Sequence, residues 1–293
     1  MATGNITVTT SDKHIDDVWV EGVIRALMFE TVIAENVDRS WDFVGHGDTY
    51  HKARFPNIES QSKSASVALD AYVYTDTEQT ISINVHTACA IKIEDIAKVL
   101  SRDDQKAHYQ KNMGYSLARA IDVDLAGLAQ SFSQTVGTYG LEVTYDNLLE
   151  SALKLEIAGY NMSDNVRWMF SPALRMGLMK MDTFIHASYV GDDAARAAHD
   201  RAKIGSFLGA PLTLTNLLRA PASGQHDNFL FHKEMIALVM AQEPKTTVDR
   251  IGLDLADVVV MDNVYGRAEI DRYSEAAGNI TATDEGAVLI KSV

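Results

Sequence analysis

The sequence lacks several features that would assign it to a common class of protein. It has a single cysteine, Cys89, among 293 residues, so no disulfide can form within the chain and a reducing compartment such as the cytoplasm is indicated. No apolar stretch reaches the roughly 18 residues that a membrane-spanning helix needs. The first residues, MATGNITVTTSDKH, have neither the basic start nor the apolar centre of a secretion signal. The sequence therefore predicts a protein made in the cytoplasm and not inserted into a membrane.

Basic residues are scarce relative to acidic ones. The chain has 26 lysines and arginines against 40 aspartates and glutamates, a formal net charge of −14, which argues against a surface that follows the phosphates of DNA or RNA. The sequence contains no G-x-S-x-G, Walker loop or G-x-G-x-x-G, so it predicts no catalytic or cofactor-binding residue. What is present is an ordinary globular composition, with 46% hydrophobic residues. At this length we expect two domains or one elaborated domain.

One cluster has the residue types of a metal site. His226, Asp227, His232 and Glu234 stand close together in QHDNFLFHKEMIALVM, and such side chains bind zinc or non-haem iron. Ligands on one helix face must be three or four residues apart, however, and His232 and Glu234 are two apart. The pattern favours a turn or helix cap followed by a buried apolar segment, with no metal and no cofactor bound. A metal-dependent enzyme remains the alternative.

The first third of the chain predicts projecting segments followed by strands. Residues 1–13 are small and polar and predict an extended arm, and 15–27 have the spacing of an amphipathic helix. Residues 45–66 are poor in apolar side chains and predict a long surface loop or a projecting hairpin. Residues 67–73 and 81–85 alternate apolar and polar side chains, which predicts an antiparallel pair of strands joined by TDTEQT.

The rest of the chain predicts one long helix and then an α/β segment. Apolar residues repeat every three or four positions toward Phe132, so we expect a helix over 93–132, with a break near 101–104 as the alternative. The next segment is a helix at 144–159, with Thr144 or Asp146 as its cap and Gly159 at its end, followed by a strand that leads into a helix with Pro172 in its first turn. A turn and strand at 206–218 and a strand leading into a helix at 228–244 come next. The chain ends with an apolar run at 256–270, which has a turn at Asp262 and Asn263, and a final strand at 286–293.

Short motifs in this order resemble those of a known family. GDTYHKARFPNI resembles the GDTV-x-(I/V)P start of a projecting loop, DNFLFHKEMIALVM resembles F-H-(K/R)-x-A-(I/V), and ADVVVMDNVYGRAEI resembles x-V-(V/I)-x-x-x-x-Y-G. Together they are similar to the major capsid protein of tailed bacteriophages, the Hong Kong 97-type fold. The resemblance implies an α+β chain. Its expected parts are an N-terminal arm and helix (1–44), an extended loop (45–86), a peripheral domain with a spine helix (87–140), an axial domain (141–262) and return strands (263–293).

The resemblance also implies a structural function. We expect hexamers and pentamers of this chain in an icosahedral shell that encloses double-stranded DNA, with portal, scaffold and decoration proteins as partners, assembled in the host cytoplasm and located in the virion. A compartment shell of the encapsulin type, with the same fold, is the alternative. The expected contacts between subunits involve residues of the loop and of the FHK motif: His51, Lys52, Arg54, Glu59, Lys63, His232 and Lys233.

Overall fold

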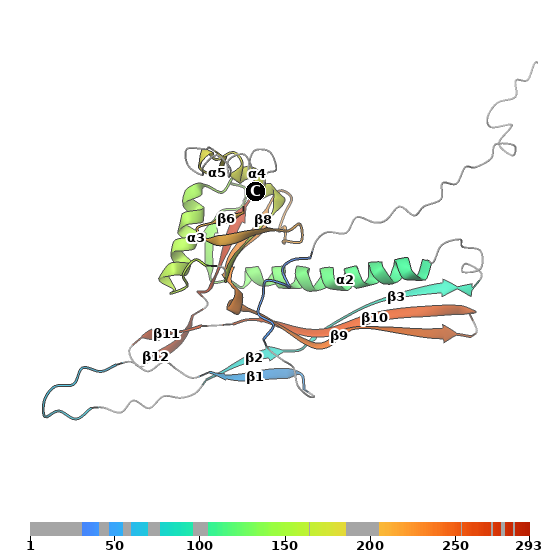
Figure 1. Ribbon diagram of the computed structural model, residues 1–293, viewed down its shortest axis with the longest axis horizontal. Helices are drawn as coiled ribbons and strands as arrows, with labels where there is room; N and C mark the ends of the chain where they lie inside the picture. The colour runs from blue at the N-terminus through green and yellow to red at the C-terminus, as the bar shows by residue number, and fades with distance from the viewer. Residues whose placement is uncertain are drawn as a thin grey trace, which may run out of the picture.

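The structure is a computed structural model, and its elements form a sheet unit, a long ribbon and a hairpin (Figure 1). The predicted arm at 1–13 and helix at 15–27 lie outside the described residues. The structure describes residues 31–40, 47–54, 60–69, 77–95, 105–163, 165–185, 205–252, 254–270, 272–276, 279–283 and 285–293.

A mixed sheet of six strands forms the first unit, in the order β4-β13-β8-β5-β7-β6. The pairs β4 with β13 and β5 with β7 are parallel, and the other pairs are antiparallel. Three short helices accompany the sheet: α3, α4 and α5. The bounds are β4 Gln134–Gly137, α3 Tyr145–Ile157, β5 Val166–Phe170, α4 Pro172–Leu178, α5 Asp182–Ile185, β6 Ser206–Phe207, β7 Ala210–Leu214, β8 His226–His232 and β13 Ala287–Ser292.

Both faces of this sheet are buried. Successive side chains of a strand point to opposite faces, and each face packs against its own set of helices. Trp168, Phe170 and Leu230 pack on one face with side chains from α3 and α4. Met169 and Phe229 pack on the other face with side chains from α2 (Gln105–Gly127), the helix that precedes the sheet unit in the chain. Strands buried on both sides read as continuous apolar runs, as FLF at residues 229–231 of β8 does.

The second unit is a long antiparallel ribbon of β3 (Val85–Glu94), β10 (Ala256–Glu269) and β9 (Ile236–Ile251), in that order. Helix α2 lies along the ribbon in Figure 1, and its 23 residues correspond to about 35 Å at 1.5 Å per residue. The short 3₁₀ helix η2 (Leu128–Gln130) continues α2 toward the sheet unit. The link between β8 and β9 is the 3₁₀ helix η3 (Lys233–Met235).

A hairpin projects from the base of the ribbon. Strand β1 (Thr49–Arg54) pairs with β2 (Thr77–Ser82) from Thr49 opposite Ser82 to Arg54 opposite Thr77. The projecting-hairpin interpretation of 45–66 is therefore confirmed for β1. A further pair, β11 (Arg272–Ala276) with β12 (Asn279–Thr283), lies between β10 and β13 in the chain.

Several local predictions are confirmed. Helix α3 begins after Thr144, whose hydroxyl accepts from the N–H of Asn147, and the chain turns at Gly159 with a φ of 86°. Strand β5 leads into α4 with Ser171 as the cap and Pro172 in the first turn. Strands β6 and β7 form the predicted turn and strand, and β13 is the final strand.

The helix predicted over 93–132 is confirmed over Gln105–Gly127 and is wrong at Ile93 and Glu94, and residues 96–104 lie outside the described residues. Ile93 and Glu94 end strand β3, and α2 begins at Gln105. In β3 the apolar Ile91 and Ile93 alternate with the exposed Lys92 and Glu94, which is the period of a strand. The alternative break at 101–104 lies outside the described residues.

The helix predicted within 228–244 is wrong, because the chain passes from β8 through η3 into β9. A short apolar run has the same composition in a buried strand and in a buried helix. The turn predicted at Asp262 and Asn263 is also wrong: both residues lie inside β10, where the register with β9 shifts. A bulge of this kind accommodates turn-forming residues without reversing the strand.

The first strand predicted at 67–73 is wrong where the structure describes it. Val67 and Leu69 lie in irregular, exposed chain. The partner of β2 is β1, and residues 77–80 of the predicted connection belong to β2 itself.

Candidate functional site

The loop carried by the hairpin is an exposed surface of the described chain. Residues 60–69, at the far side of the loop in Figure 1, are almost entirely exposed. Val67 and Leu69 expose 60% and 55% of their surface. No described segment of the chain covers these two side chains.

The root of the hairpin is buried. Ile81 of β2 and Ile83, which follows it, pack with Ala237 and Val239 of β9. The N–H of Ile83 donates to the carbonyl of Asp48 at 2.7 Å, which closes the hairpin at its base. The exposed loop between β1 and β2 therefore extends from a strand pair that is packed against the ribbon.

Gly266 of β10 lets the root approach the ribbon closely. A Cβ atom at this position would stand 2.6 Å from the carbonyl oxygen of Ser82 and 3.1 Å from the Cα of Ile83. Only glycine leaves room for backbone on backbone at such a distance. This requirement accounts for the glycine in the YGRAE stretch of β10.

Polar contacts join helix α2 to β10. The hydroxyl of Tyr265 donates to Asp124 Oδ2 at 2.9 Å, and Arg267 Nη2 donates to Asp124 Oδ1 at 3.1 Å. Burial, and then the hydrogen bond to Asp124, raise the pKa of the Tyr265 phenol. These bonds supplement the apolar contacts of Leu125 and fix the helix along the ribbon.

A second carboxylate of α2 holds the segment that precedes the hairpin. Asp122 is fully buried and accepts from the N–H groups of Val32, Ile33 and Ala34 at 2.7, 3.1 and 2.9 Å. Burial raises the pKa of Asp122, whereas these three hydrogen bonds act to lower it. Ile33 and Val37 are buried beside α2, so residues 31–38 are attached to the core by both polar and apolar contacts.

Asp227, from the candidate metal cluster, has a structural role. Its buried carboxylate accepts from the Tyr139 hydroxyl at 2.6 Å and from Arg219 Nη1 at 3.1 Å. Burial, and then the bond to Asp227, raise the pKa of Tyr139 to about 12. With a phenol and a guanidinium already bound, this carboxylate is satisfied without a metal ion.

The other candidate ligands are not brought together. His226 and His232 are the two ends of β8, about 20 Å apart at 3.3 Å per residue. His232 Nδ1 accepts from the N–H of Glu234 at 3.4 Å, and its ring lies on that of Tyr160 with centroids 5.0 Å apart. Within the described part of the chain, no three histidine, cysteine or carboxylate side chains are grouped as a metal site.

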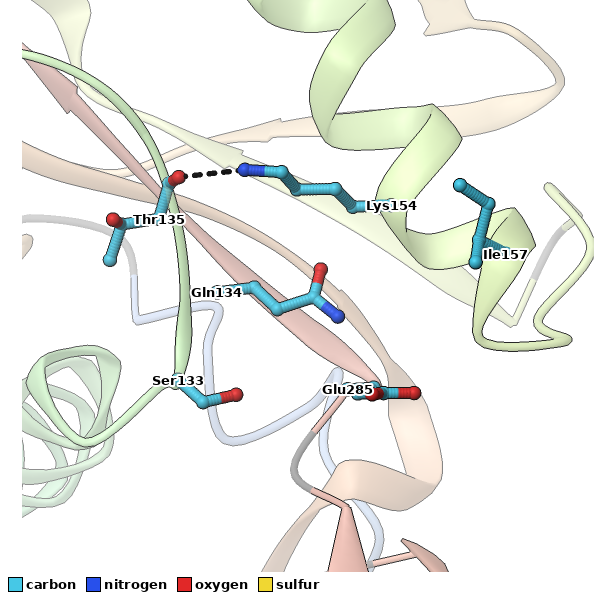
Figure 2. A pocket seen from close by; sticks show the side chains of 6 residues that line it. All are labelled: Ser133, Gln134, Thr135, Lys154, Ile157 and Glu285. Atoms are coloured by element: carbon cyan, nitrogen blue, oxygen red, sulfur yellow. Dashed lines mark hydrogen bonds between the residues drawn. The ribbon is translucent and has the colours of Figure 1, made fainter. Parts of the chain in front are cut away.

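An open pocket of about 410 Å³ lies between β4 and α3 (Figure 2). Gln134 and Thr135 line it from the strand, and Lys154 and Ile157 line it from the helix, with Ser133 and Glu285 completing the wall. Lys154 Nζ donates to the carbonyl of Thr135 at 2.9 Å. The pocket is open to solvent, and its charged lining groups are one lysine, Lys154, and one glutamate, Glu285.

Solved structures match this chain over most of its length. A structure titled Mycobacterium phage Che8 matches with a TM-score of 0.78 at 19% identity, over 94% of this chain and 96% of that chain. A chain of the capsid of cyanophage P-SCSP1u matches with a TM-score of 0.75 at 15% identity, over 96% and 93%. A chain of the mature capsid of bacteriophage PhiM1 matches with a TM-score of 0.73 at 12% identity, over 94% and 91%. The chain has the fold of phage capsid proteins. No family model and no curated protein matches the sequence.

The predicted α+β capsid fold is thus confirmed. Within it, His51 and Lys52 are exposed on β1, and Lys63 is exposed on the loop. His51 Nδ1 lies 3.4 Å from Glu78 Oε2 across the hairpin. Arg54 ends β1, but its side chain is outside the described residues, as is Glu59.

His232 and Lys233 lie elsewhere in the capsid fold. They stand at the junction of β8 and η3, where His232 is half-buried and Lys233 is exposed. Among the residues that the structure describes, no helix has both the length and the apolar character that crossing a bilayer requires.

Sequence reasoning missed the anchoring residues Asp122, Asp124, Tyr265 and Arg267. A weak signal existed for the first two, because carboxylates at 122 and 124 interrupt the apolar stripe formed by Ile121 and Leu125. Their partners are separated from them by about 90 and 140 residues, and no pattern in a single sequence reports such pairs.

Proposed function

We propose that this chain is the major capsid protein of a tailed phage, and that its copies assemble as hexamers and pentamers into an icosahedral shell. The observation that carries the proposal is the fold match to phage capsid structures over 94–99% of the chain. The match extends over 91–99% of those chains as well, so the hairpin, the ribbon and the sheet unit are all included. The predicted division into arm, loop, peripheral, axial and return segments is part of this proposal.

The exposed loop supports assembly on physical grounds. Specific contacts between proteins bury about 1,000 Å² or more in total, and a projecting hairpin adds contact area without enlarging the core of its own subunit. Val67 and Leu69 offer apolar side chains for such a contact. The rigid root at Ile81 and Ile83 holds the loop in place for the neighbouring copy.

In the proposed contact between subunits, the charged residues of the hairpin lie around the apolar residues of the loop. His51, Lys52, Arg54, Glu59 and Lys63 are proposed to pair with groups of the neighbouring subunit, and His232 and Lys233 to form a second contact. Exposed ion pairs contribute about 0–1 kcal/mol each. They set the partner and its register more than the strength of the contact.

The acidic composition is consistent with a container for double-stranded DNA. A net charge of −14 per subunit repels a polyanion, and the repulsion is screened over about 8 Å at physiological salt. The shell would hold DNA without binding a particular sequence. We propose portal, scaffold and decoration proteins as further partners, assembly in the host cytoplasm and a final location in the virion, and no enzymatic activity.

The test is assembly of the purified full chain, alone and with candidate scaffold protein from the neighbouring genes. We expect closed particles by negative-stain microscopy and a corresponding fast-sedimenting species. Soluble chains that never form capsomers or particles under either condition would contradict the proposal.

The content of particles isolated from cells separates the two shell functions. A phage coat is expected to yield particles that hold double-stranded DNA, measured by absorbance and nuclease digestion after opening. Particles that hold one cargo enzyme and no DNA would favour the encapsulin-type compartment, which the phage capsid matches do not favour.

A further inference from the structure

Helix α3 buries one apolar face, and the side that the described chain leaves exposed carries a second apolar stripe among carboxylates such as Asp146 and Glu150. Leu148, Ala152 and Leu155 face the sheet and are buried. Leu149, Leu153 and Ile157 are spaced by four residues, so they form a stripe nearly opposite the buried face. Their exposed fractions are 37%, 55% and 76%. A surface helix usually places polar residues there, so the stripe needs its own explanation.

The surroundings of the stripe exclude two simple occupants. The neighbouring pocket touches the stripe only at Ile157 and is open and largely polar (Figure 2), unlike the enclosed apolar site that a small molecule requires. An added strand on the free edge of β4 is also disfavoured, because Lys154 Nζ already binds the carbonyl of Thr135 there. Lysine on an edge strand is a common barrier to strand addition.

A second copy of this chain is the occupant that the proposed function supplies, because the matched structures include chains of assembled phage capsids. Figure 1 shows α3 and loop residues 60–69 toward the same side of the molecule, so a neighbouring copy that contacts the loop approaches the molecule on the side where α3 lies.

The size of the stripe sets a limit on its role. Three partly exposed side chains offer far less than the roughly 800 Å² per partner of a standard interface. The stripe alone cannot hold two subunits together, and it must form one part of a larger contact that includes the hairpin.

We infer that the stripe Leu149, Leu153 and Ile157 of α3 is buried against a neighbouring copy of this chain within the capsomer. This inference rests on the proposed function and adds to it a contact surface outside the hairpin. The stripe is exposed in the single chain, and the assembled shell covers it.

The test uses a single thiol as a reporter of burial. Cys89 is replaced in Cys89→Ser, and Leu153→Cys is added, so that position 153 carries the only thiol of the chain. The rate of labelling by a small neutral maleimide is measured in free subunits, in assembled particles and in particles that have been dissociated again. We expect the rate to fall at least tenfold on assembly and to recover on dissociation.

Two paired variants test the effect on assembly. Leu153→Asp with Ile157→Asp is expected to lower particle yield at least tenfold. Both side chains are exposed, so the free subunit should stay folded, and its melting temperature should fall only slightly because aspartates near a helix C-terminus weaken the helix. The apolar exchange Leu153→Ile with Ile157→Leu is the matched control and should assemble normally.

The outcomes separate this inference from the proposed function. If the reporter chain forms particles but its thiol at position 153 is labelled equally fast in particles and in free subunits, the inference fails and the capsid function stands. Normal assembly of the double aspartate variant would overturn it as well. If the wild-type chain forms no particle, the proposed function itself fails.

Discussion

Two carboxylates of α2, only two residues apart, hold different parts of the chain. Asp122 receives three backbone N–H groups of residues 32–34, and Asp124 receives Tyr265 and Arg267 of β10. Residues two apart on a helix point in different directions, so one helix can hold the incoming segment on one side and the ribbon on the other. The helix thus organises segments that are distant in sequence.

Replacement of Asp122 by alanine should destabilise the free subunit. The change leaves three backbone donors at 32–34 without their acceptor, and an unsatisfied buried donor costs about 1–3 kcal/mol. Because Val32 and Ala34 are only partly buried, water can replace part of the loss. We expect the free energy of unfolding to fall by about 3 kcal/mol, measured by urea denaturation of unassembled protein.

Asp249→Ala is the matched control for this measurement, since Asp249 is exposed on β9. A surface change of this kind should alter stability by no more than about 0.5 kcal/mol. If Asp122→Ala lost no more than Asp249→Ala, the anchoring role of Asp122 would be refuted.

Tyr139 should make stability depend on alkaline pH. Burial and the bond to Asp227 raise its pKa to about 12, above the value of about 10 in an unfolded chain. A phenol with a raised folded-state pKa contributes stability that is fully present below about pH 10 and is lost as the pH rises through about 12. In Tyr139→Phe the fall of the unfolding free energy between about pH 9.5 and 11.5 should therefore be shallower than in the wild type. Parallel urea titrations measure it, and identical slopes would count against the hydrogen bond.

At the scale of the elements, the sequence predicted best where one local signal dominates. The period of α2 toward Phe132, the Thr144 cap and Pro172 after Ser171 are all local, and each was located correctly. Residues 77–80 of strand β2, TEQT, were predicted as part of a connection because all four are polar and no apolar residue alternates with them. The segment 236–240 was taken for a helix because its partner β10, which makes it a strand, is distant in sequence.

The exposed surfaces of the candidate site could be predicted from the sequence only in part. The exposed loop was recognised from its composition, since a segment poor in apolar residues cannot bury itself. The stripe of α3 was not, because Leu149, Leu153 and Ile157 have the same composition as core residues, and only the fold shows which face is covered. Asp227 was weighed as a ligand candidate and interpreted as part of a turn or cap, and its actual bonds could not be predicted because its partners Tyr139 and Arg219 come together with it only in the folded chain.

The close approach of the hairpin to the ribbon can be tested at Gly266, with Gly114 of α2 as a comparison. In Gly266→Ala the added methyl group meets the backbone at Ser82 and Ile83, so strand and root must separate, at a cost of about 1–3 kcal/mol. Gly114→Ala is the matched variant in α2, where the nearest atom is Met261 Sδ at 3.9 Å. Alanine is the better helix former by up to about 1 kcal/mol, so this variant should be stabilised. Thermal unfolding of free subunits should shift in opposite directions, and equal shifts would contradict the close approach at Gly266.

The whole molecule combines a rigid frame with surfaces that the frame does not cover. The sheet unit buries both of its faces, and α2 is fixed along the ribbon by Tyr265 and Arg267. The loop at 60–69 and the outer face of α3 are left exposed on one side. Such a division lets a subunit fold independently and keeps its apolar contacts for neighbours. Stability and assembly should therefore respond to different substitutions.

The double variant Val67→Ser with Leu69→Ser tests this separation directly. Both side chains are more than half exposed, so the unfolding free energy of the subunit should change by less than about 0.5 kcal/mol. Burial of such a side chain at a contact contributes about 1.5–3 kcal/mol when complete, and about 1.4 kcal/mol corresponds to a factor of ten. The protein concentration at half-maximal assembly, measured by light scattering, should rise at least tenfold, whereas Ser62→Ala on the same loop should leave it unchanged. An unaltered assembly threshold would mean that the loop reaches no neighbour, and an equal loss of subunit stability would mean that fold and contact are not separate.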